Sequence, residues 1–170
     1  MKRLFAALLA LCLLFSAALA EELNWEEYEE EVGRTGRTEQ VKVPDKGTVK
    51  FWMPKTLKAT DVKKIKADVR PAAAYKSKKG FAATITVMNV TSLEDYTNEL
   101  KAAGADYFNN MKINGIDCVG CENEQSDMEM LLVPVDETTV LVYQLSPLDT
   151  EDEDWDEMKG YIIASIRFDK

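Results

Sequence analysis

The fold is decided by residues 105–147, which read ADYFNNMKINGIDCVGCENEQSDMEMLLVPVDETTVLVYQLSP. The dipeptide Asn114-Gly115 lies between two arms rich in β-forming residues, and both residues tolerate the positive φ of a type I′ turn. Farther along, residues 128–133 can pair with residues 138–145 across the connection 134–137. The stretch therefore predicts two successive antiparallel hairpins. The nearly continuous apolar arm 138–145 indicates a central strand that is covered on both faces.

Two further strand pairs are predicted before this region. Residues 40–43 and 48–53 flank a turn that contains Pro44 and Gly47, and residues 72–76 and 81–88 flank Lys79-Gly80. Pro54 ends its strand because proline lacks the N–H donor that a central ladder requires. Between the pairs, residues 55–66 alternate lysines with apolar side chains, which predicts a short helix or a looped crossing with a solvated basic face.

Helices are predicted after the second strand pair and near the end of the chain. Thr91-Ser92-Leu93-Glu94 has the form of a capping box, the stripe continues through Leu100, and Gly104 ends the helix. Residues 154–166 repeat apolar side chains at helical spacing. The order of strands, helix, strand meander and helix predicts an α+β fold, in which one antiparallel sheet of hairpins has helices packed against it.

The first twenty residues form a predicted signal peptide. Lys2-Arg3 precedes an apolar run, and Ala18-Leu19-Ala20 is a cleavage-type tripeptide, so we expect cleavage before Glu21 and a secreted or extracytoplasmic product with no membrane span after cleavage. Residues 21–38 are then an N-terminal helix or a loosely held arm. Residues 39–170 are predicted to be a single α+β domain, a natural count for this length.

Charge is distributed unevenly along the chain. The net charge of −9 becomes −11 when Lys2 and Arg3 leave with the leader, which makes nucleic acid a poor partner. Residues 21–31 and 149–157 are acidic, whereas residues 55–79 are basic. The basic segment predicts a face that contacts an anionic surface polymer or an unknown protein, and its candidate residues are Lys55, Lys58, Lys63, Lys64 and Lys66. Ordinary solvation of these lysines, or docking on the acidic segments, is the alternative.

The chain contains no histidine, and this removes several classes of chemistry at once. Serine and cysteine triads of the usual kind, histidine general bases and imidazole metal sites all require that side chain. Residues 149–154 alternate acids as a calcium loop does, but they lack the turn glycine and the properly spaced final Glu, so we interpret them as a solvated acidic loop. No catalytic residue, metal site or cofactor is predicted.

Cys118-Val119-Gly120-Cys121 is the sharpest motif in the chain. A redox-active pair usually lies at a helix N-terminus, whereas this pair lies in a predicted strand beside Asp117 and Glu122. We expect a structural disulfide between Cys118 and Cys121, which requires a bulge or turn at Val119-Gly120, because residues three apart in a regular strand point to opposite faces. Two unpaired thiols, or redox or metal chemistry, are the alternatives.

The order of elements resembles the PsbP-like fold, an α/β/α sandwich found in an extrinsic photosystem II family, in a nuclear-import factor and in many uncharacterised exported bacterial proteins. The residues that carry the resemblance are 49–54, Asn114-Gly115, 140–147 and 162–166, and it spans residues 39–168. None of these residues is a catalytic signature. The resemblance implies a non-catalytic binding or assembly module with an unknown ligand and no enzymatic activity. The alternative is a thiol-disulfide or other enzyme that uses Cys118 and Cys121.

Overall fold

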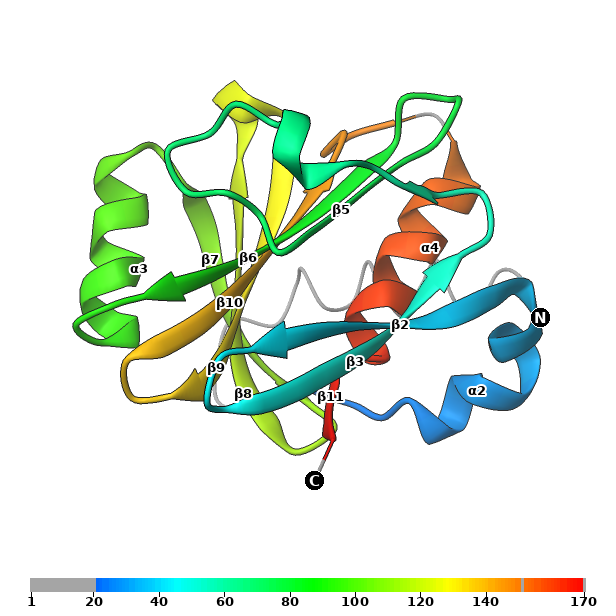
Figure 1. Cartoon of the computed structure of the whole chain (residues 1–170), viewed down its shortest axis with the longest axis horizontal. Helices are drawn as coiled ribbons and strands as arrows, with labels where there is room; N and C mark the ends of the chain where they lie inside the picture. The colour runs from blue at the N-terminus through cyan, green and yellow to red at the C-terminus, as the bar shows by residue number, and fades with distance from the viewer. Residues whose placement is uncertain (1–20, 151, 170) are drawn as a thin grey trace.

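The computed structural model describes residues 21–150 and 152–169, so the predicted signal peptide lies outside the described residues. Strands take up more of the described chain than helices do (Figure 1). In chain order the elements are β1 (Glu21–Leu23), α2 (Glu26–Val32), η1 (Gly33–Thr35), β2 (Gly36–Val43), β3 (Gly47–Pro54), β4 (Lys58–Ala59), η2 (Val62–Lys64), β5 (Ala73–Lys76), β6 (Ala82–Asn89), α3 (Leu93–Ala102), β7 (Asp106–Ile113), β8 (Ile116–Asn123), η3 (Glu124–Ser126), β9 (Met128–Asp136), β10 (Thr139–Ser146), α4 (Glu153–Ala164) and β11 (Arg167–Asp169).

The predicted hairpins form the large sheet, whose strand order is β1-β7-β8-β9-β10-β6-β5-β4. The β7–β8 turn has φ of 47° at Asn114 and 80° at Gly115, as the predicted turn requires. Strand β10 pairs antiparallel with β9 on one side and with β6 on the other, so it is the central strand that its apolar sequence predicted. The α+β fold class is confirmed.

A second, smaller sheet replaces part of the single sheet that the sequence predicted. The β2–β3 hairpin is formed as expected, but it joins β11 in a separate sheet of order β11-β3-β2. The pairing of Phe168 with Val49 brings the end of the chain to its first hairpin. Contacts between residues this far apart leave no local signal, so the separate sheet was not predictable from periodicity.

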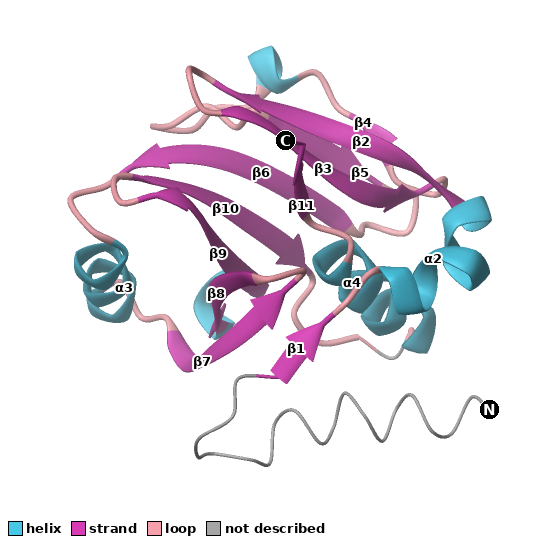
Figure 2. Cartoon of the chain, turned by 90° about the horizontal axis from the view of Figure 1, so that it is seen from below, coloured by secondary structure: helices cyan, strands magenta, loops and turns pink. Residues whose placement is uncertain are grey.

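The layers follow from the two apolar faces of the large sheet. Leu131 and Tyr143 on the inner face pack with Phe51 of the small sheet and with Trp155 and Ile162 of α4. On the outer face, a second cluster of strand residues packs against the apolar stripe of α3; it comprises Leu132, Val140, Val142, Leu93, Tyr96 and Leu100. Figure 2 shows α3 on one side of the large sheet and α4 with the small sheet on the other.

The caps of two helices differ by a residue or two from those predicted. Helix α3 begins at Leu93 with Ser92 as its cap, and the hydroxyl of Ser92 accepts a hydrogen bond from the backbone N–H of Asp95 at 3.0 Å. Helix α4 begins at Glu153 after Asp152, whose side chain makes no capping bond. It is held at its other end by Ser165, whose hydroxyl accepts a hydrogen bond from the backbone of Trp52 at 2.7 Å.

Candidate functional site

The predicted basic residues lie on exposed backbone between β3 and β5, and they divide into two groups. Lys58 is on β4, Lys63 and Lys64 are in η2, and Lys66 follows η2; all four are exposed. Lys55 belongs elsewhere, because it lies in the turn after β3 and its ammonium group donates a hydrogen bond to the carbonyl of Arg34 at 2.9 Å. The first group, not Lys55, forms a candidate site.

Two lysines face each other across the β4–β5 ladder. Lys58 is directly opposite Lys76, and both are exposed. Side chains that are directly opposite in an antiparallel pair have Cβ atoms about 5 Å apart, and like charges there are destabilising. Within the part of the chain that the structure describes, neither lysine forms an ion pair with a carboxylate. The ladder therefore concentrates positive charge that the fold itself does not neutralise.

The loop between β4 and β5 adds to this charge and is held firmly at its base. The backbone N–H of Thr60 donates to the carbonyl of Ala74, and that of Ala72 donates to the carbonyl of Ile85, both at 2.8 Å. Residues 58–76 carry six basic side chains against two acidic ones, Asp61 and Asp68. We call the six residues the basic surface: Lys58, Lys63, Lys64, Lys66, Arg70 and Lys76.

Docking of the predicted lysines on the acidic segments, one of the alternatives, does not account for the basic surface. Lys64 lies 3.9 Å from Asp61, which belongs to the same short segment. The contact with an acidic segment is made instead by Lys79, whose ammonium group lies 2.5 Å from Asp152. Sequence reasoning missed Lys76 and Arg70, although both lie inside the basic segment 55–79. The signal that could have found Lys76 was the predicted strand 72–76, but its partner β4 is only two residues long.

The expected disulfide is corrected by the structure. Cys118 and Cys121 are free and buried, and β8 continues through both residues with paired neighbours on each side. The irregularity lies instead in β7, between Asp106 and Asn109. Cys118 packs in the inner core, and Cys121 packs with Met130 on the outer face, so the two thiols lie on opposite sides of the sheet. The predicted bulge at Val119-Gly120 is wrong.

Gly120 has a different role from the one predicted. A Cβ atom at this position would lie 2.3 Å from the side-chain oxygen of Asn109 on β7. The glycine therefore allows a close approach across the ladder and leaves the strand straight.

The surroundings of the cysteines are unfavourable to thiolate chemistry. Burial, with the charge of Asp117, raises the pKa of the Cys118 thiol to about 12. Burial and the nearby carboxylates, chiefly those of Glu122 and Glu129, raise the pKa of the Cys121 thiol to about 11. Reactive cysteines have lowered pKa values and partial exposure. Both thiols are packing groups in this arrangement.

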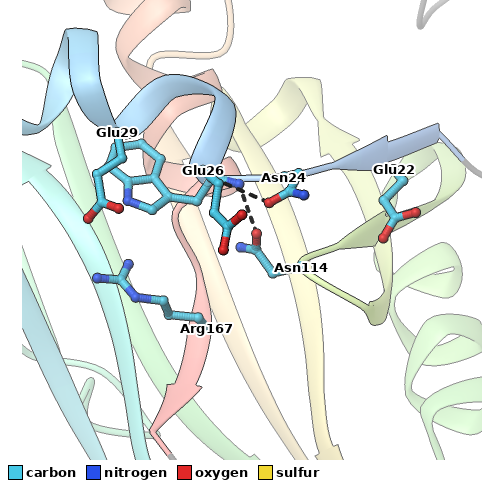
Figure 3. Close-up of a pocket in the computed structure, with 7 residues that line it drawn as sticks. Glu22, Asn24, Glu26, Glu29, Asn114 and Arg167 are labelled. Carbon is cyan, nitrogen blue, oxygen red and sulfur yellow. Dashed lines mark hydrogen bonds between the residues drawn. The ribbon is translucent and has the colours of Figure 1, made fainter.

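An open hollow of about 420 Å³ lies where the N-terminal arm meets the β7–β8 turn (Figure 3). The carboxylates of Glu22, Glu26 and Glu29 line it on the side of the arm, and Arg167 lies below them. Asn24, Trp25 and Asn114 complete the lining.

The side chain of Asn114, which lines this hollow, makes hydrogen bonds that hold other segments in place. Its side-chain oxygen accepts from the backbone N–H of Trp25 at 2.8 Å, and its amide group donates to the carbonyls of Ala164 and Ile166, both at 2.8 Å. Its backbone N–H donates to the carbonyl of Leu23, also at 2.8 Å. The turn that sequence analysis identified as a hairpin signal thus also fastens the N-terminal arm and the end of α4. The hollow therefore lies at the junction of these elements, and Asn114 serves to join them.

Two further features bear on ligands and on the membrane. Within residues 21–150 and 152–169, no group of three or more Cys, Asp or Glu side chains is arranged to hold a metal ion. Over the same residues, no helix has the length and apolar character that crossing a bilayer requires.

Comparison with known proteins adds a likeness in fold. No family model and no curated protein matches the chain. Among solved structures, the chain is similar to cyanobacterial PsbP from Synechocystis sp. PCC 6803, with a TM-score of 0.48 and 13% sequence identity over 82% of this chain and 96% of that chain. The matched protein has the same fold name, PsbP, as the resemblance noted in the sequence. The likeness concerns the fold and says nothing about activity or partner.

Proposed function

We propose that the protein is an exported, non-catalytic binding module whose basic surface holds an anionic partner. The observation that carries this proposal is the exposed pair of Lys58 and Lys76, directly opposite each other on β4 and β5. A fold gains nothing from like charges in this position. An anionic partner that bridges the two ammonium groups would convert the repulsion into attraction.

The charge of the remaining chain makes this surface distinct. The whole sequence carries a net charge of −9, yet residues 58–76 carry six basic and two acidic side chains. A positive patch on an acidic protein orients an approaching anion, since the rest of the surface repels it. The firm base of the loop, at Thr60 and Ala72, lowers the entropy that binding would cost.

The thiol-enzyme alternative is disfavoured by the same structure. Attack by a thiol requires the thiolate and access to it, and both Cys118 and Cys121 are buried with raised pKa values. Export is supported by the leader sequence, in which Lys2-Arg3, an apolar run and Ala18-Leu19-Ala20 follow in order.

Binding to long-chain inorganic polyphosphate tests the proposal. We expect the exported protein to bind it at about 20 mM salt and to release it at about 200 mM, because salt screens contacts between exposed charges. The double variant Lys58→Glu with Lys76→Glu should bind about tenfold more weakly or worse, since each basic residue near an anionic surface contributes about 1 kcal/mol.

The matched control reverses two exposed lysines on other elements, Lys42 on β2 and Lys101 on α3. It changes the net charge equally, so it separates the effect of the basic surface from that of overall charge. Equal losses in the two double variants would contradict the proposal, as would binding that is indifferent to salt or absent at low salt.

A further inference from the structure

The loop that carries the basic surface also exposes an apolar side chain. Val69 is 46% exposed, and the only other exposed large apolar residue within the described part of the chain is Tyr107. Tyr107 is on β7, near the other edge of the large sheet. The loop ends are tied to β5 and β6 through Thr60 and Ala72, so Val69 is presented on anchored backbone.

The loop that contains Val69 is rich in basic side chains interspersed with apolar ones. Arg70 follows Val69 directly, Lys66 lies three residues before it, and the acid Asp68 immediately precedes it; all are exposed, while Val62 and Ile65 of the same loop are half-buried. A soluble polyanion would use only the cations of such a loop. A bilayer surface uses both kinds of side chain, because ammonium and guanidinium groups contact lipid phosphates while an apolar side chain enters the boundary between head groups and acyl chains.

We propose, building on the proposed function, that the anionic partner is a lipid bilayer surface and that Val69 inserts into it between Lys66 and Arg70. The position of the acidic helix α2 is compatible with this orientation. Figure 1 shows the loop, in cyan-green, at the top of the view, and α2 with its acidic first turn at the lower right, well away from it. With the basic surface against the bilayer, the acidic helix is held away from the lipid charge.

Co-sedimentation with vesicles tests this inference on the exported protein. The probes are vesicles of phosphatidylcholine alone and of phosphatidylcholine with phosphatidylglycerol, each at about 20 and about 200 mM salt. We expect binding to the anionic vesicles alone, weakened by salt. Val69→Ser should weaken vesicle binding about fivefold, because serine loses the apolar contact with the lipid. A fivefold change corresponds to about 1 kcal/mol, since 1.4 kcal/mol is tenfold in affinity. Val69→Phe should strengthen vesicle binding.

Tyr107→Ser is the matched control, since it removes the other exposed apolar side chain and should leave vesicle binding unchanged. Polyphosphate binding by Val69→Ser should equal that of the wild type, because the contacts to a soluble anion use the cations only. Circular dichroism checks that each variant is folded.

The outcomes separate the inference from the function on which it rests. Polyphosphate binding without vesicle binding would overturn the bilayer as partner and leave the proposed function standing. Equal vesicle binding by wild type and Val69→Ser would overturn insertion. Loss of binding to both probes at low salt would overturn the inference and the proposed function together.

Discussion

The hydroxyl of Tyr143 is buried in the inner core and has no hydrogen-bond partner among the described residues. A buried hydroxyl without a partner has lost its hydrogen bonds to water and gained none in the protein. Tyr143→Phe should therefore leave the free energy of unfolding unchanged or raise it by about 1 kcal/mol. Tyr75→Phe is the comparison, because the hydroxyl of Tyr75 interacts with the carboxylate of Glu39 and its removal should cost about 1 kcal/mol. Denaturant unfolding measures both, and a larger loss in Tyr143→Phe than in Tyr75→Phe would contradict the account.

The two buried thiols give a second expectation at the residue scale. Cys118 and Cys121 should both react slowly with an alkylating reagent in the folded protein, because each is buried and has a raised pKa. Both should react fully after unfolding without reductant. Intact mass reads the number of alkylated sites, and two sites that become reactive only with reductant would restore the disulfide.

Asn114 fastens three segments through one side chain, and its φ of 47° adds a conformational requirement. Asn114→Gly keeps the conformation and removes the three side-chain hydrogen bonds, so it should lower the free energy of unfolding by about 1–3 kcal/mol. Asn114→Ala should cost about 1 kcal/mol more, since alanine resists positive φ. Asp45→Gly is the control at another positive φ, on an exposed turn. If Asn114→Gly were as stable as the wild type, the three side-chain hydrogen bonds of Asn114 would contribute nothing to stability.

At the scale of elements, three neighbouring strands place carboxylates side by side. Glu122 on β8 is opposite Asp106 on β7 and Glu129 on β9. Lys159 of α4 reaches this row, with its ammonium group 3.5 Å from Glu129 and 3.1 Å from Asp156. Burial first, then the charges of Glu129 and Asp149, raise the pKa of Glu122 above its ordinary 4.5, and burial chiefly raises that of Glu129.

The row of carboxylates predicts a definite pH dependence. A pKa that is higher in the folded than in the unfolded state gives stability below the unfolded pKa, and this stability is lost as the pH rises through the folded pKa. Glu122→Gln should therefore be more stable than the wild type near pH 7, and the difference should disappear near about pH 4. Urea unfolding across this range checks the sign, with Glu137→Gln in the exposed β9–β10 turn as the control. A variant less stable than the wild type near pH 7 would contradict it.

The elements that sequence predicted well are those with local signals. The turn at Asn114-Gly115, the stripe of α3 and the apolar arm of β10 each depend on residues close in the chain. The parallel pairing of β1 with β7 and the addition of β11 to β3 do not, because each joins segments far apart in sequence. The straight strand at Cys118 was missed because a glycine between cysteines predicts a bulge. In the structure, Gly120 instead leaves room for the side chain of Asn109 on the neighbouring strand.

The candidate site was predicted in part for a related reason. Its lysines are consecutive enough to be recognised as a basic segment, and four of the five named residues belong to the basic surface. The pairing of Lys58 with Lys76 depends on the register of a two-residue strand, which no periodicity can reveal. Lys55 was included by its place in the sequence, although its ammonium group is turned to the carbonyl of Arg34.

At the scale of the whole molecule, the β4 end of the large sheet carries a cluster of basic side chains on a protein with a net charge of −9. This arrangement places the proposed binding edge at β4 apart from the buried thiols of β8 in the strand order of the large sheet. Residues far from that edge should therefore affect mainly the stability of the fold. Substitutions on the edge should alter binding and leave the free energy of unfolding nearly unchanged.

Mapping the contact by amide chemical shifts during titration with polyphosphate at low salt tests this claim most directly. We predict that the amides of β4, η2 and β5 shift, with the largest changes at Lys58, Lys63 and Lys76, and that those of β2, α2 and β8 do not. Shifts centred on β2 or α3, or no shifts at low salt, would contradict the claim that the basic surface is the binding site.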